Sequence, residues 1–223
     1  MTRLELADGI AHIQLDDGKV NAMSSAFMAE LGKALDQAEA ADAVTVLRGR
    51  PGIFSAGFDL GTFQRGREAT LEMLRAGARL IERLLAFPRP VLTACTGHAY
   101  PMGAFLMLAA DVRFAVSGPW KIGMNEVAIG LTVPRFAIEL ARHRLTPPGF
   151  ARITTAAMFA PDEARELGYV DRVLERAQLD AAVQEEALRL GKLDMTAYAG
   201  TKARVNERVR AAVRAAIAEE LAS

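Results

Sequence analysis

The chain is organised around residues 97–126, GHAYPMGAFLMLAADVRFAVSGPWKIGMNE. A turn with glycine and proline over residues 97–103 leads into an apolar run, residues 104–110, which predicts a helix without ionisable side chains. A helix that is apolar on every side is a buried helix. Its first N–H groups have no intrahelical acceptor and lie at the positive end of the helix dipole. We therefore expect main-chain groups at this turn to form a site for an anion or a polarised oxygen.

The same stretch ends on an acid, Glu126, in an apolar setting. Its apolar neighbours along the chain are Met124, Val127, Ile129 and Leu131. Burial beside apolar side chains raises the pKa of a carboxyl group, so that it can accept and return a proton near neutral pH. An oxyanion site combined with such an acid favours proton transfer next to a carbonyl group. The alternative is a surface acid on a loop.

Composition limits the class of protein. With 223 residues, 51% hydrophobic and 24% charged, the chain predicts a compact folded body and not a disordered one. The 27 basic and 27 acidic residues cancel, so no overall field attracts nucleic acid or an anionic membrane. The single cysteine, Cys95, excludes an internal disulfide. Together with only three histidines, it makes a metal site unexpected.

The N-terminus has no apolar run behind its first arginine, and no stretch approaches the roughly twenty apolar residues of a membrane span. We expect a soluble protein of the reducing cytoplasm, without a membrane partner.

Before residue 97 the pattern alternates strands and helices. The elements expected are a hairpin over 3–7 and 10–15, a helix that begins at Ser24 or Ser25, a buried strand over 44–48, an amphipathic helix over 69–86 and a buried strand over 91–95. Between them, residues 49–60 read as a loop whose glycines and small residues let a ligand approach the backbone. An ordinary strand-to-helix turn is the alternative for that loop.

Beyond Glu126 the pattern is mainly helical. It predicts helices over 135–144 and 178–190, a helix start near 161–163 and an edge strand over 169–174. Val205, Val209, Val213, Ile217 and Leu221 are spaced four apart and form an apolar stripe. Such a stripe packs either on its own domain or on another subunit, and both remain open. We expect an α/β core over residues 1–145 and a helical C-terminal region over 146–223 packed on it.

Several short motifs recur in a fixed order. They are IFSAGFDL (53–60), GHAYPMG (97–103), AADVR (109–113) and GMNEV (123–127) with IGL (129–131), reinforced by KVNA (19–22), APDEA (160–164) and GYVD (168–171). In this order, over about residues 5–175, they resemble the crotonase superfamily, also called the enoyl-CoA hydratase/isomerase family. The resemblance implies a spiral of strand-strand-helix repeats, followed by helices that mediate trimers, often paired into hexamers.

The resemblance also implies a site. In this family two backbone N–H groups hold the thioester oxygen of an acyl-CoA, and by position in the motifs they belong here to Phe58 and Met102. Each such bond is worth roughly 3 to 4 kcal/mol to an enolate-like transition state. Pro101 departs from the family's usual glycine next to this turn. Residues implied to contact CoA or the substrate are Ser55, Ala56, Gly57, Asp59, Gly103, Phe105 and Leu131. No cofactor is implied, because CoA is part of the substrate.

One position separates two activities within the family. Phe105 stands where hydratases commonly carry the first of two glutamates, whereas Glu126 matches the second. Isomerases that move a double bond between the 3 and 2 positions resemble this single-glutamate pattern. Isomerisation is therefore favoured over hydration of 2-enoyl-CoA, and a catalytically weak acyl-CoA-binding protein is the third alternative. The remaining polar residues of the motifs, and the cysteine, are expected to be structural: Asp59 as a helix cap, His98, Asp111, Arg113 and Cys95.

Overall fold

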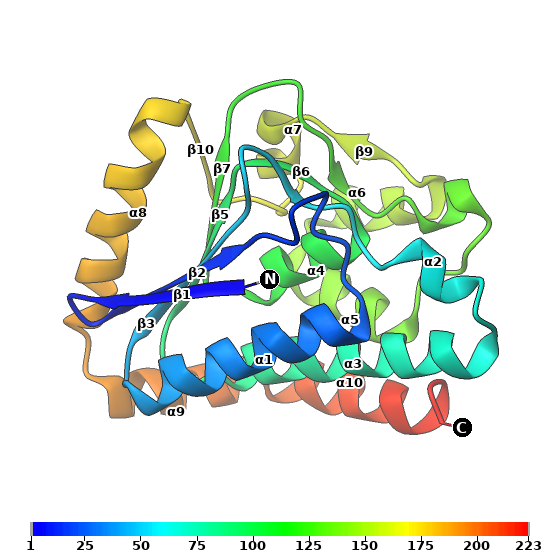
Figure 1. Ribbon diagram of the computed structural model, residues 1–223, viewed down its shortest axis with the longest axis horizontal. Coiled ribbons are helices and arrows are strands. Elements are labelled where there is room, and N and C mark those ends of the chain that lie inside the picture. The colour runs from blue at the N-terminus through cyan, green and yellow to red at the C-terminus, as the bar shows by residue number, and fades with distance from the viewer. Residues whose placement is uncertain (1, 223) are drawn as a thin grey trace.

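A six-stranded sheet forms the centre of the computed structural model, which describes residues 2–222 (Figure 1). The strands follow the order β1-β2-β3-β5-β7-β10. They are β1 (Thr2–Ala7), β2 (Ile10–Leu15), β3 (Val44–Arg48), β5 (Val91–Cys95), β7 (Val112–Val116) and β10 (Arg172–Leu174). β1 and β2 form the predicted antiparallel hairpin, turning at Asp8 and Gly9 with φ of 53° and 74°, and all other pairs are parallel.

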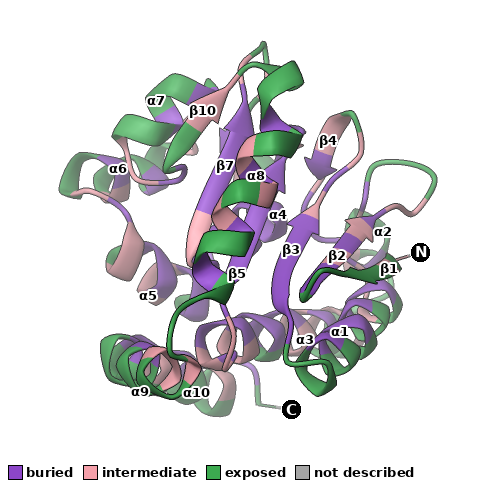
Figure 2. Ribbon diagram, turned by 90° about the vertical axis from the view of Figure 1, so that its left-hand side faces the viewer, coloured by how far each residue is buried: buried purple, intermediate pink, exposed green. Residues whose placement is uncertain are grey.

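Helices cover both faces of this sheet, which is why its central strands read as continuous apolar runs. α1 (Ser25–Ala40) and α3 (Arg67–Ala86) lie on one face, and α8 (Arg176–Gly191) lies on the other (Figures 1 and 2). α1 begins where the sequence predicts, because the Ser24 side chain accepts a hydrogen bond from the N–H of Phe27. The strands between the helices are buried, whereas α8 exposes its outer side.

A second, four-stranded sheet accounts for the second strand of the strand-strand-helix repeats that the family resemblance implies, although the residue pattern alone did not place it. Its order is β4-β6-β8-β9, formed by β4 (Gly52–Ser55), β6 (Gly97–Ala99), β8 (Ile122–Gly123) and β9 (Met158–Phe159). The loop expected over 49–60 and the turn expected over 97–103 each contain one of these strands, so both predictions were wrong there. Gly97 permits the pairing, since a Cβ atom on it would lie 1.9 Å from the carbonyl carbon of Gly52.

The buried helix α4 (Pro101–Ala109) starts three residues earlier than predicted, and all nine of its residues are buried. Pro101 occupies its first turn, where the missing N–H costs nothing and the fixed φ favours the helix. The departure from the family's glycine is therefore compatible with a regular helix start. Gly103 brings α4 close to β4, because a Cβ atom on it would lie 2.9 Å from the Cβ of Ser55.

The C-terminal region packs on the core. Its further helices are α6 (Pro147–Ala151), η2 (Arg152–Thr155), α7 (Pro161–Glu166), α9 (Met195–Val205) and α10 (Glu207–Glu219). The core also contains α2 (Leu60–Phe63), η1 (Glu126–Ile129) and α5 (Arg135–Arg144). α10 lies against α3 and α5 and buries Val209 and Val213 (Figure 1). The apolar stripe therefore packs on its own domain. Val205 does not join it and is 61% exposed, because the helix breaks at Asn206.

Two strands of the C-terminal region belong to the sheets of the core: β10 to the six-stranded sheet and β9 to the four-stranded sheet. The division into a core over residues 1–145 and a helical C-terminal region over residues 146–223 therefore remains a proposal. Among the described residues, no helix combines the length and the apolar character needed to cross a bilayer.

Candidate active site

The turns that follow β4 and β6 lie against each other. The two strands are parallel, with Ile53 opposite His98 and Ser55 opposite Ala99. The N–H of Tyr100 then donates to the carbonyl oxygen of Ser55 at 2.9 Å. One step further, a Cβ atom on Gly57 would lie 3.3 Å from the Cδ of Pro101. Parallel pairing of two short strands therefore brings together the two turns that lead to Phe58 and Met102.

The main-chain N–H of Phe58 is left without a partner. Around it, the N–H of Ala56 donates to Val20 O at 2.9 Å, that of Gly57 to Ser55 Oγ at 3.1 Å, and that of Asp59 to Met23 O at 3.4 Å. Within residues 2–222 no acceptor receives the N–H of Phe58, although this residue is only 8% exposed. Buried N–H groups are nearly always paired, so an external acceptor is the expected partner.

The start of α4 supplies two further free donors. The first helical hydrogen bond runs from Ala104 N to Tyr100 O at 2.9 Å, and Pro101 has no N–H. The N–H groups of Met102 and Gly103 thus have no acceptor in the described chain, at the positive end of the helix dipole. The side chains of Phe58 and Met102 meet at α3, since a Cβ atom on Gly77 would lie 2.8 Å from the Phe58 ring and 3.3 Å from Met102 Sδ.

A mainly apolar cavity of about 390 Å³ opens at these turns. Its walls include Ala56, Phe58, Pro101, Glu126, Ile129 and Leu131. Within the described part of the chain, Glu126 is the one carboxyl group among the lining residues. The free backbone donors and a single acid are therefore near one cavity, which is the arrangement expected for acting on a carbonyl compound.

Glu126 itself is a buried acid without a partner. It is 5% exposed, and neither carboxyl oxygen meets a hydrogen-bond partner among residues 2–222. Burial raises the pKa of Glu126 to about 7, while its own main-chain N–H opposes this shift. The 3-10 turn η1 holds it in place: Gly130 closes the turn in the left-handed conformation, and Leu131 N donates to Glu126 O at 2.9 Å. A carboxyl group with this pKa can both take and give a proton at neutral pH.

Apolar burial of Glu126 does not come from all the neighbours that the sequence suggested. Met124 is buried and Leu131 lines the cavity, but Val127 is 47% exposed, and Ile129, which also lines the cavity, is 46% exposed. A group that sequence reasoning missed is Tyr169, in the GYVD motif. Burial raises the pKa of Tyr169, and the charge of Glu126 raises it further, so the phenol lies within electrostatic reach of the acid. In the sequence, the only feature that could have indicated this group is the tyrosine within the GYVD motif.

Phe105 lies behind the cavity and does not line it. Its ring is fully buried and makes edge contacts with Phe58, at 6.4 Å between ring centroids, and with Phe136, at 5.7 Å. Ser55, Gly57, Gly103 and Met102 likewise support the turns from behind the wall. Of the residues implied to contact CoA or the substrate, Ala56 and Leu131 reach the cavity surface, and so does Phe58, one of the two expected oxyanion donors.

The remaining polar candidates have structural roles. Asp59 caps α2, accepting from Gly61 N at 3.1 Å and from Thr62 Oγ1 at 2.7 Å. His98 Nδ1 accepts from Lys121 N at 3.0 Å. Arg113 pairs with Asp171 at 2.6 Å. Burial raises the pKa of the Cys95 thiol to about 12, which leaves it unreactive. Within residues 2–222 no cluster of acidic, histidine or cysteine side chains is placed to hold a metal ion.

Known proteins share this sequence and fold. The family model "Enoyl-CoA hydratase/isomerase" matches residues 5–222. A solved enoyl-CoA hydratase/isomerase family protein from Pseudomonas syringae is 40% identical, with a TM-score of 0.97 over 99% of this chain and 96% of that one. The apo enoyl-CoA isomerase of Mycobacterium tuberculosis is 37% identical, with a TM-score of 0.92 over 97% and 95%.

Curated relatives carry both activity names. A probable enoyl-CoA hydratase of Bacillus subtilis is 31% identical over 186 residues, 78% of this chain and 71% of that protein. The human mitochondrial enoyl-CoA delta isomerase 1 is 28% identical over 180 residues, 78% of this chain and 59% of that protein. The names of the relatives thus do not separate isomerase from hydratase. Fold, motifs and family match agree that this chain is an enzyme of the enoyl-CoA hydratase/isomerase family, in the crotonase superfamily.

Proposed function

We propose that the enzyme moves the double bond of 3-enoyl-CoA thioesters to the 2 position, with Glu126 as its single acid and base. The observation that carries this proposal is the lone buried carboxyl group of Glu126 in an apolar cavity. The position at which hydratases commonly carry the first of their two glutamates holds Phe105, whose buried ring can neither ionise nor hold a water molecule.

The chemistry needs one base and two donors. Glu126 removes a proton from C2 of the 3-enoyl thioester, and the electron pair spreads onto the thioester oxygen as a dienolate. The N–H groups of Phe58 and Met102 donate to that oxygen, where charge develops. Protonated Glu126 then returns the proton to C4, which leaves the double bond between C2 and C3. No water is consumed and the base is regenerated.

Segment 55–59 supports the same assignment. Its glycine and small residues would allow the CoA part of the substrate to lie along the backbone of Ser55, Ala56, Gly57 and Asp59. The acyl part would enter the cavity beside Leu131, with Phe105 behind the wall and Gly103 supporting the turn. CoA belongs to the substrate, so the proposed reaction needs no separate cofactor.

Hydration of 2-enoyl-CoA is the rival activity, favoured by the name of the B. subtilis relative. It requires a water molecule held and activated beside Glu126. Incubation with 3-enoyl-CoA and 2-enoyl-CoA separates the two activities by mass, because hydration adds one water and isomerisation adds nothing. Conversion of 3-enoyl-CoA without change of mass supports the proposal, and growth of a hydrated product alone contradicts it. CoA binding without turnover of either substrate would identify an acyl-CoA-binding protein.

Two variants sharpen this test. Phe105→Glu restores the missing carboxyl group, and gained hydratase activity would show that this position limits the wild-type reaction. Unchanged turnover in Glu126→Gln would remove Glu126 from the mechanism.

We further propose that the enzyme works in the cytoplasm as a homotrimer or as a dimer of trimers, as the family resemblance implies. Sedimentation equilibrium of the purified protein tests this assembly, and a monomer at micromolar concentration would contradict it.

A further inference from the structure

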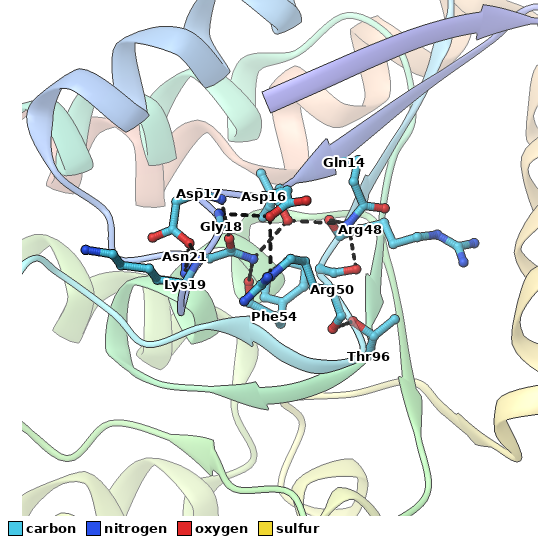
Figure 3. Close-up of polar contacts among 12 residues, drawn as sticks. Gln14, Asp16, Asp17, Gly18, Lys19, Asn21, Arg48, Arg50, Phe54 and Thr96 are labelled. Carbon is cyan, nitrogen blue, oxygen red and sulfur yellow. Dashed lines mark hydrogen bonds and ion pairs between the residues drawn. The ribbon is translucent and has the colours of Figure 1, made fainter. Parts of the chain in front are cut away.

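The segment that precedes α1 carries a compact hydrogen-bond network centred on Asp17, which is partly buried, and Asn21, which is buried (Figure 3). The Asp17 carboxylate accepts three main-chain N–H groups: Oδ1 from Lys19 at 2.7 Å and from Asn21 at 2.8 Å, and Oδ2 from Ala22 at 3.1 Å. Burial alone would raise the pKa of Asp17, but these bonds and Arg50 together lower it. We name the pair Asp17 and Asn21 the turn clamp.

Asn21 uses both ends of its side-chain amide. It is fully buried and has φ of 53°, a left-handed conformation that asparagine tolerates better than most residues. Its Nδ2 donates to Leu15 O at 2.9 Å and to Phe54 O at 3.1 Å, and its Oδ1 accepts from Asp17 N at 3.0 Å. One amide therefore ties the end of β2 to the end of β4.

Ser55 continues the connection to both turns of the candidate site. Its Oγ donates to Asn21 O at 2.7 Å and accepts from Gly57 N at 3.1 Å. Its carbonyl oxygen accepts from Tyr100 N, one residue before α4. The side chain and main chain of Asn21 are thus linked, through Phe54 and Ser55, to the segments that present the N–H groups of Phe58 and Met102.

The neighbouring segment 20–23 completes the alignment. Val20 O accepts from Ala56 N, Gly57 O accepts from Met23 N at 2.8 Å, and Met23 O accepts from Asp59 N. Anchors therefore lie on both sides of Phe58 while its own N–H has no acceptor in the described chain. Any shift of segment 20–23 would turn this free donor.

We propose that Asn21, held in its left-handed conformation by Asp17, is a positioning residue that aims the Phe58 N–H at the substrate oxygen. The inference rests on the proposed function, because it assumes that this N–H meets a developing oxyanion. Asn21 does not touch the cavity and acts only through the 54–58 turn.

Such a residue has a characteristic kinetic effect. A donor that strengthens in the transition state changes kcat, whereas interactions equal in both states change KM. Removing an oxyanion donor costs about 10²- to 10³-fold in kcat, and misplacing a group by about 1 Å costs up to about 10²-fold. Loss of the clamp, which misdirects the donor without deleting it, should therefore lower kcat by roughly 10- to 100-fold.

The test compares Asn21→Gly with a matched control, Asn206→Ala. Glycine keeps the left-handed conformation and removes the amide. Asn206 is also buried and donates its Nδ2 to a backbone carbonyl, Leu85 O at 2.9 Å, but it lies at the α9–α10 junction. Turnover of 3-enoyl-CoA is measured for both variants. Asn21→Gly should lose roughly 10- to 100-fold in kcat with KM within about threefold, and Asn206→Ala should keep kcat within about threefold.

Ligand binding gives a readout that a general loss of structure would not produce. 3-Oxobutanoyl-CoA ionises readily at C2, between two carbonyl groups, to an enolate that carries charge on the thioester oxygen, whereas butanoyl-CoA does not. Asn21→Gly should lower the affinity for 3-oxobutanoyl-CoA by the same factor as it lowers kcat, and should leave the affinity for butanoyl-CoA unchanged. Should Asn21→Gly fail to fold, Asp17→Asn takes its place, with an expected kcat loss of about 3- to 10-fold in the same pattern.

Two results would overturn the inference. One is an equal kcat loss in Asn21→Gly and Asn206→Ala. The other is an equal loss of affinity for both CoA ligands in Asn21→Gly. Failure of the proposed function looks different, since the unmodified protein would then leave 3-enoyl-CoA unconverted. The comparison of the two CoA ligands would still test whether Asn21 aims the Phe58 N–H.

Discussion

The two ends of helix α4 treat buried polar groups in opposite ways. At its start, the N–H groups of Met102 and Gly103 have no partners in the described chain, and neither does the carboxyl group of Glu126, which lines the same cavity as Pro101. At its end, Arg144 donates to Leu108 O at 2.8 Å and to Ala110 O at 2.7 Å. There Asp111 Oδ2 accepts from Val91 N, from the Tyr198 hydroxyl and from Lys202 Nζ, at 2.7 to 2.8 Å.

The contrast shows where the fold contributes stability and where it contributes reactivity. A buried polar group without a partner costs free energy of folding, whereas a paired one does not. The start of α4 bears this cost and offers its groups to a ligand. The end of α4 satisfies its carbonyl groups and fixes α9 to the core through Asp111. Four predictions, from the largest expected effect to the smallest, test this contrast between the reactive start and the stabilising end of α4.

Glu126→Gln should lower turnover of 3-enoyl-CoA by roughly 10²- to 10⁴-fold, the usual effect of losing a general base. The same carboxyl-to-amide change at the other end, Asp111→Asn, should keep turnover of the folded protein within about threefold. Steady-state kinetics of the two variants measures this. Equal losses at both positions would erase the distinction between the two ends.

Asp111→Asn should lower the free energy of unfolding by about 3 to 5 kcal/mol, since removing one partner leaves the other charge buried without compensation. The Lys202 side chain is 5% exposed, and burial lowers the pKa of Lys202 while Asp111 opposes that shift. Urea denaturation measures the change. Lys202→Met in the Asp111→Asn background should recover part of the loss, and a purely additive double variant would show that the two residues are not coupled.

The pH dependence should follow Glu126. Its pKa is raised from 4.5 to about 7, so the base is charged only above this range, and kcat/KM should rise with pH and level off above about 7. Stability should change in the opposite sense. A raised folded-state pKa favours the native state at low pH, and this contribution is lost as pH rises through about 7.

Glu126→Gln removes that titration, so at pH 8 it should be more stable than the unmodified protein by roughly 2 to 3 kcal/mol, and at pH 4 the difference should vanish. Thermal unfolding at the two pH values checks the sign. A pH-independent difference would mean that Glu126 is not desolvated in solution.

Gly77→Ala should disturb the start of α4 from the α3 side. The added Cβ would approach the Phe58 ring to 2.8 Å, so the ring must shift. We expect a loss of about 1 kcal/mol in stability and about threefold in kcat. In the control Gly200→Ala, on α9, nothing lies within 4 Å of the new Cβ, and helix propensity should add about 1 kcal/mol with unchanged turnover.

Much of the fold followed from hydrophobic patterning. The hairpin, the buried strands β3 and β5 and helix α5 lie where apolar runs and caps placed them. The second sheet followed only from the strand-strand-helix repeats implied by the family resemblance, because β8 and β9 are two residues long and too short for a periodic pattern to place them. Val205 was assigned to the apolar stripe by spacing alone, which could not show the helix break at Asn206.

For the candidate site, sequence motifs indicated Phe58, Met102 and Glu126, and their catalytic roles stay predictions. What the sequence could not show was which main-chain groups remain unpaired, since this depends on contacts between residues far apart. Asn21 illustrates the limit: its motif contributed to the family resemblance, but its hydrogen bond to Phe54 O spans 33 positions. The electrostatic link between Tyr169 and Glu126 is of the same kind.

Helix α4 has nine residues, and none of them reaches the surface. Its later amides, hydrogen-bonded and enclosed, can exchange with deuterium only when the whole domain opens, so their exchange should report the global free energy of unfolding. The free donor of Met102 is carried by that same enclosed helix. Local unfolding should therefore not remove the Met102 donor before the rest of the domain unfolds. We expect heat inactivation to coincide with loss of the entire fold.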